Sequence, residues 1–148
     1  MSRSGLSSEG QCLVEGTASG EALVLSEPLS FWGGLDSASG RIIDRHHPQA
    51  GEVVSEKVLV MPRGRGSSSS SSTLAEALAL GTGPAAIVLA EPDPIVALGS
   101  LVMQELYGRP TPVVVVTRDL YERISTGDRL TVNAPREGPV TIRVEDAT

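Results

Sequence analysis

Residues 57–116 read KVLVMPRGRGSSSSSSTLAEALALGTGPAAIVLAEPDPIVALGSLVMQELYGRPTPVVVV, and this stretch decides the fold class. It opens with an aliphatic, β-branched run that ends at Pro62, which is typical of a buried strand. Similar runs follow at 85–90 and 112–116, and segments rich in helix formers lie between them at 73–80 and 94–106. Strand, helix, strand, helix, strand predicts two crossover units on a parallel or mixed sheet.

Further strands are expected on both sides of this stretch. Residues 12–18 and 21–25 are apolar and are split by Ser19-Gly20, which favours a β-hairpin. Residues 130–133 and 140–144 alternate in polarity, as half-exposed strands do. Residues 1–10 are polar and rich in serine and glycine, and we expect them to form a disordered lead-in. The prediction is a single mixed α/β domain over 11–148 with β-hairpins at both termini.

Composition narrows the class of partner. The chain has 148 residues with 12 basic against 18 acidic side chains, a net charge of -6, which disfavours binding to nucleic acid. No apolar stretch approaches the roughly 18 residues that span a bilayer, so we expect no membrane contact and a cytoplasmic protein. Cys12 is the single cysteine, which rules out an internal disulfide and a thiolate-held iron–sulfur cluster built from this chain alone.

The serine-rich segment at 63–72 could be a flexible linker, as such runs often are. Its position indicates otherwise, because it follows a buried strand and precedes a helix, where open α/β sheets bind ligands. Main-chain N–H groups, the helix dipole, Arg63 and Arg65 together favour a small anion. A serine here would act as a base only if a neighbour such as Arg65 stabilised the alkoxide.

Other polar residues have simpler interpretations. His46 and His47 could be metal ligands, but adjacent side chains diverge and no third ligand is spaced nearby, so we favour solvated loop residues or a contact that supports another site residue. They could also belong to a serine triad, but no Gly-x-Ser-x-Gly elbow is present. We expect Asp36 and Asp44 to order their loop by turn hydrogen bonds rather than to act in catalysis. Trp32 is interpreted as an anchor, either for its own loop or against a partner.

A series of short motifs resembles one known family. They are SFWGGLD at 30–36, GRIID at 40–44, HP at 47–48, VMPRGRGSS at 60–68, PAAI at 84–87, ALG at 97–99 and TGD at 126–128. Their order and density are similar to the small subunit, or swivelling domain, of the aconitase X family. The resemblance covers nearly the whole chain after the lead-in.

The resemblance implies a swivelling β/β/α fold that closes over a large partner subunit in a heterodimer. The partner carries the iron–sulfur cluster, this chain holds no metal, and activity requires both. In relatives the first serine after the Gly-basic-Gly triplet removes the substrate proton, which corresponds to Ser67. The substrate-binding residues that we assign beside it are Arg63, Arg65, Gly66, Ser68, Gly33 and Gly34. This chain has serine throughout 68–72, where relatives commonly have a glycine before the last serine.

The reaction implied is dehydration of a hydroxy acid. The family acts on cis-3-hydroxy-L-proline in bacteria and on mevalonate 5-phosphate in archaea, and the motifs at 31–34, 44–48 and 105–108 favour the first. From another class, swivelling domains also serve as phosphohistidine carriers or scaffolds. Carriers use a histidine in a Gly-Gly-x-x-Ser-His setting, which neither His46 nor His47 has.

Overall fold

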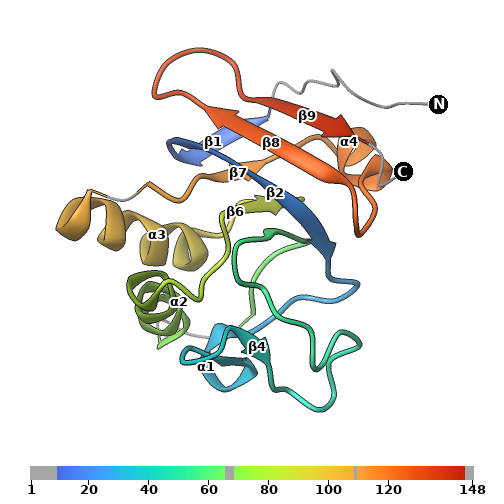
Figure 1. Ribbon diagram of the computed structural model, residues 1–148. Helices are drawn as coiled ribbons and strands as arrows, with labels where there is room; N and C mark the ends of the chain where they lie inside the picture. Colours follow the sequence, from blue (N-terminus) through green and yellow to red (C-terminus); the bar gives the residue numbers. More distant parts are fainter. Residues whose placement is uncertain (1–9, 66–68, 109, 146–148) are drawn as a thin grey trace.

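The computed structural model describes residues 10–65, 69–108 and 110–145. The centre of the fold lies within residues 57–116. The elements are β5 (Val58–Met61), α2 (Ser69–Leu80), β6 (Ala86–Leu89), α3 (Pro94–Tyr107) and β7 (Val113–Val115). The three strands are parallel neighbours, so each helix crosses from one strand to the next. Both predicted crossover units are confirmed (Figure 1).

Four further strands extend this centre into a mixed sheet. They are β1 (Gln11–Val14), β2 (Gly16–Val24), β8 (Arg129–Ala134) and β9 (Thr141–Glu145). Within the described residues the strand order is β1-β7-β6-β5-β2-β8-β9. The end of β2 pairs parallel with β5, while its first part pairs antiparallel with β8. β8 and β9 form the predicted hairpin near the C-terminus.

The predicted hairpin near the N-terminus is wrong. Strand β1 pairs antiparallel with β7, and β2 runs without a break through Ser19-Gly20. The glycine serves close packing rather than a turn, because a Cβ at Gly20 would lie 2.7 Å from the main-chain oxygen of Glu56. Only Glu15 separates β1 from β2, which leaves no room for a hairpin loop.

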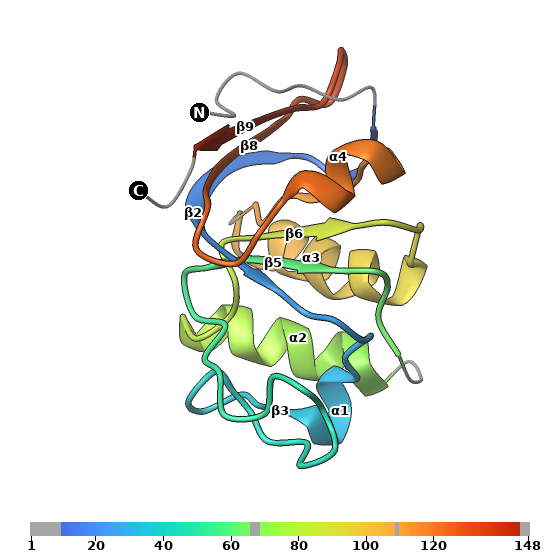
Figure 2. The ribbon, with the colours of Figure 1, turned by 90° about the vertical axis from the view of Figure 1, so that its right-hand side faces the viewer.

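The parallel strands are buried on both faces, which explains their unbroken apolar runs. Leu59 and Met61 of β5 face the core shared with α2 and α3. Val58 and Val60 face the core shared with β8, β9 and α4 (Arg118–Arg123). Figure 2 shows the resulting layers, with α2 and α3 on one side of β5 and β6 and the β8–β9 hairpin on the other. This is the expected β/β/α arrangement.

The long segment after β2 is ordered by short elements and turns. It contains α1 (Phe31–Gly34), β3 (Leu35–Asp36) and β4 (Arg41–Ile42), the last two paired antiparallel. The Asp36 carboxylate accepts hydrogen bonds from the Ser39 hydroxyl at 2.7 Å and the Ala38 amide at 3.3 Å. Asp44 accepts one from the His46 amide at 2.9 Å. Both aspartates order this segment by turn hydrogen bonds, as predicted.

Helix α2 begins at Ser69, earlier than the predicted start at residue 73. Ser70 and Ser71 are buried, and a Cβ at Gly99 of α3 would lie 2.8 Å from the main-chain oxygen of Ser71. Close packing of the two helices therefore outweighs the modest helix propensity of serine. In the part of the chain that the structure describes, no helix combines the length and apolarity needed to cross a membrane.

Candidate functional site

The carboxyl ends of β2, β5 and β6 lie at the same edge of the sheet, and the chain leaving β5 is fixed there by main-chain contacts. The Pro62 oxygen accepts hydrogen bonds from the amides of Ala90 and Glu91 at 3.1 and 3.0 Å. The Gly64 amide donates to a carboxylate oxygen of Asp93 at 2.9 Å. The Arg65 amide donates to the Leu29 oxygen at 3.0 Å. The strand that enters the predicted site is thus held from both sides.

Three of the predicted site residues, Gly66, Ser67 and Ser68, lie outside the described residues. The residues on either side of them are described. Arg65 lies at the carboxyl edge of the sheet and Ser69 begins α2. The predicted location between a strand end and a helix start therefore holds for both flanks of the segment.

The two arginines diverge from one another. Arg63 forms an ion pair with Glu91 at 3.2 Å, and Arg65 lies 3.9 Å from a carboxylate oxygen of Glu27. Each arginine side chain is 57% exposed. Ion pairs this exposed contribute about 0–1 kcal/mol, so an incoming anion can displace either carboxylate at little cost.

Ser70 links residues 63–65, which we call the arginine loop, to α1, a connection that the sequence did not reveal. The buried Ser70 hydroxyl accepts a hydrogen bond from the Trp32 amide at 3.4 Å and lies 3.4 Å from the Arg65 oxygen, to which it donates. It also lies 3.3 Å from the Ser30 hydroxyl. Arg65 and the predicted Gly33-Gly34 pair are therefore brought to the same side of the N-terminus of α2.

The two glycines of α1 differ in environment. Gly33 is exposed, has φ +78, and a Cβ there would meet nothing within 4 Å, so the space above its main chain is open. Gly34 is buried, and a Cβ there would lie 3.2 Å from Leu29. Trp32 is 64% exposed, whereas Phe31 is buried. Phe31 therefore anchors this loop, and Trp32 remains accessible to a partner.

The histidines do not form a metal site with each other. His46 is exposed. His47 is buried, and its Nδ1 accepts a hydrogen bond from the Gln49 amide at 3.0 Å. Its Nε2 therefore carries the proton and donates to the main-chain oxygen of Glu27 at 3.1 Å. With both ring nitrogens engaged by the main chain, His47 orders the loop rather than binding a metal or a phosphoryl group.

The described residues do not fit an iron–sulfur cluster. They contain no group of three or more His, Cys, Asp or Glu placed to hold a metal ion. Cys12 lies half-buried in β1, next to the core under the β8–β9 hairpin. Burial raises the pKa of its thiol, and the nearby Glu15 carboxylate raises it further. This favours the neutral thiol over the thiolate that a cluster requires.

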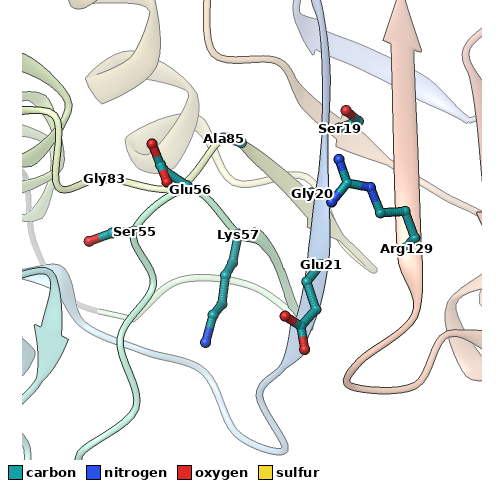
Figure 3. A pocket seen from close by; sticks show the side chains of 9 residues that line it. All are labelled: Ser19, Gly20, Glu21, Ser55, Glu56, Lys57, Gly83, Ala85 and Arg129. Carbon is teal, nitrogen blue, oxygen red and sulfur yellow. The ribbon is translucent and has the colours of Figure 1, made fainter. Parts of the chain in front are cut away.

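A separate cavity of about 600 Å³ opens at the other end of the parallel strands (Figure 3). Its charged lining comprises Glu21, Glu56, Lys57 and Arg129. Lys57 immediately precedes β5, so the cavity lies at the amino-terminal edge of the sheet. None of the predicted site residues that the structure describes lines it, and carboxylates and cations are mixed within it.

The fold and the loop at the carboxyl edge define the class: a swivelling β/β/α domain. Residues 7–142 match the family model described as the aconitase X swivel domain, so the chain belongs to that family. The crystal structure of Thermococcus kodakaraensis aconitase X in its holo-form matches with a TM-score of 0.83 and 30% identity, over 96% of this chain and 100% of that chain.

Two curated relatives illustrate the sequence similarity. Cis-3-hydroxy-L-proline dehydratase of Pseudomonas aeruginosa is 52% identical over 101 residues, which cover 68% of this chain and 17% of the relative. The phosphomevalonate dehydratase small subunit of Methanosarcina mazei is 34% identical over 84% of this chain and 83% of the relative. The chain thus spans less than a fifth of the length of the first relative. The family resemblance seen in the sequence is confirmed.

Proposed function

We propose that this chain is the small, swivelling subunit of an aconitase X-type hydro-lyase and supplies Ser67 as the base for dehydration of a hydroxy acid. The observation that carries the proposal is the location of Arg65 and Ser69, which flank residues 66–68 in the sequence. They lie at the carboxyl edge of the sheet and at the start of α2, in a member of the aconitase X swivel family. Small anions bind at such helix starts.

In the proposed reaction Ser67 removes a proton from the carbon next to the one that bears the hydroxyl group. The electron pair of the broken C–H bond forms the new C=C bond as the C–O bond breaks, and the departing hydroxide takes up a proton to become water. That proton is balanced over the turnover by the one that Ser67 gains from the substrate and then returns to solvent. Serine is a weak base by itself, so the alkoxide must be stabilised by its surroundings. Arg65 and the N-terminus of α2 flank Ser67 in the sequence, and both supply positive charge.

The remaining assigned residues would hold the substrate. The exposed ion pairs of Arg63 and Arg65 can be exchanged for a substrate carboxylate, which arginine binds with two parallel hydrogen bonds. The open space at Gly33 allows a ligand to approach the main chain, with Gly34 packed behind it. Main-chain groups at 66 and 68 complete the set. Because the chain has a single cysteine and its described residues do not fit a cluster, we assign the family's iron–sulfur cluster to a large partner subunit.

The preferred substrate is cis-3-hydroxy-L-proline, supported by the 52% identity to the dehydratase that bears this name. Mevalonate 5-phosphate is the second candidate, supported by the match over 83% of a phosphomevalonate dehydratase small subunit. Both substrates carry a carboxylate, so the arginine loop suits either. The phosphate of the second adds negative charge that would need a further basic group.

The test is anaerobic co-expression with an aconitase X large subunit from the same organism, followed by dehydration assays on both substrates. We expect a stable complex, activity on cis-3-hydroxy-L-proline and none from the small chain alone. Activity on mevalonate 5-phosphate instead would reverse the choice of substrate. If no complex and no activity form, the carrier reading returns, and labelling by a phosphoryl donor at the exposed His46 would establish it.

A further inference from the structure

We infer that Asp93 is a positioning residue for the Ser67 loop, an inference that rests on the proposed function. Asp93 lies just beyond β6, 26 positions after Ser67, and none of the family motifs includes it. One of its carboxylate oxygens accepts the Gly64 amide at 2.9 Å. The other accepts the amides of Ile95 and Val96 at 3.0 and 3.2 Å, as the N-cap of α3.

The Asp93 carboxylate therefore joins the segment before Ser67 to the start of α3. Gly64 packs so closely that a Cβ there would lie 2.9 Å from the Asp93 carboxylate and 2.8 Å from Val96. The next amide, that of Arg65, is held from the other side by Leu29. Two consecutive amides are thus fixed directly before Gly66 and Ser67.

An aspartate is suited to this double contact because both of its oxygens are acceptors. Asparagine offers one acceptor oxygen and a donating amide group, so it can satisfy the helix or the loop but not both. Serine is as good an N-cap as aspartate, but its single short hydroxyl cannot also reach Gly64. Asp93→Ser therefore separates the cap of α3 from the contact with the loop.

The experiment compares parent, Asp93→Ser and Asp93→Asn in the assembled two-subunit enzyme, together with amide hydrogen exchange on the small chain. In Asp93→Ser we expect exchange at Gly64 to accelerate about tenfold or more, while Ile95 and Val96 stay protected. Misplacing the base should lower kcat about 10- to 100-fold and change KM less than about threefold. Thr117→Ala is the matched control: it removes the cap contact to Leu120 at the start of α4 and should leave kcat unchanged.

The two failures can be told apart. If the parent complex has no dehydratase activity, the proposed function fails. If the parent is active and Asp93→Ser keeps its kcat despite faster exchange at Gly64, the positioning role is overturned. If Asp93→Ser does not fold, Asp93→Asn decides through its exchange pattern: faster exchange at Gly64 with an unchanged kcat overturns the role, and a lower kcat with that exchange supports it.

Discussion

Replacing Gly20 with alanine tests whether the close packing of β2 against the main chain of Glu56 requires a glycine. The added Cβ would lie 2.7 Å from the Glu56 oxygen, well inside normal contact. The Glu56 carbonyl group cannot easily move, because main-chain hydrogen bonds hold its own peptide unit and the one before it. The Glu56 amide, in a residue with φ +61, donates to the Gly83 oxygen at 3.2 Å. The Lys57 amide donates to the main-chain oxygen of Val54 at 3.0 Å. Overpacking of this kind costs about 1–3 kcal/mol.

Part of this cost is offset because alanine has less freedom than glycine in the unfolded chain, a gain of about 0.4–1 kcal/mol. At the middle of the two ranges the expected net loss is about 1.3 kcal/mol in the free energy of unfolding, measured by urea denaturation followed by circular dichroism. Ser19→Ala is the control, since Ser19 is exposed on the same strand and should change stability by less than about 0.5 kcal/mol. A Gly20→Ala variant as stable as the parent would refute the close-packing explanation.

Three further predictions follow from the described contacts. Arg65→Lys should lower kcat/KM about tenfold or more through loss of bidentate binding, yet change the free energy of unfolding by under about 0.5 kcal/mol because its ion pair with Glu27 is exposed; equal turnover would remove Arg65 from the site. Burial raises the pKa of both Cys12 and Tyr121, so the folded chain keeps these groups neutral and loses stability as pH rises past their ordinary values. The urea concentration at the midpoint of unfolding should therefore decrease as the pH rises above about 8.5. In Cys12→Ser the first part of this decrease should be smaller, because the Cys12 contribution is absent. A midpoint that does not change with pH would contradict this. Trp32, the sole tryptophan and 64% exposed, should be quenched freely by acrylamide in the isolated chain, and its fluorotryptophan NMR signal should shift on binding the large subunit; weak quenching would show that it is buried.

Local patterns were enough to predict the parallel centre of the fold. The apolar runs of β5, β6 and β7 are continuous because each strand is buried on both faces, and this leaves a direct signal in the sequence. The alternation in β8 and β9 was equally informative, because one face of each strand is exposed. The position of the serine-rich segment between the β5 and α2 patterns predicted a ligand site there, and the resemblance to the family then implied the role of Ser67.

Contacts between distant segments left no such signal. Gly20 was interpreted as a turn residue. The glycine is needed there because Glu56 approaches it closely, and Glu56 lies 36 positions away in the sequence, where no local pattern can show the contact. The early start of α2 depends on packing against Gly99, and the role of Ser70 on its contact with Trp32. For Asp93 a partial signal existed: Asp before Pro marks a helix start. Only the structure shows that the same carboxylate also holds the loop.

The most direct test of the central claim is the turnover of Ser67→Ala in the two-subunit enzyme, with Ser72→Ala as control. Ser72 belongs to the same serine run but is exposed within α2. Loss of the base should lower kcat by about 10²–10⁴-fold with the complex intact, while Ser72→Ala stays within about twofold of the parent. A Ser67→Ala enzyme that forms the complex and turns over like the parent would contradict the assignment of Ser67 as the base.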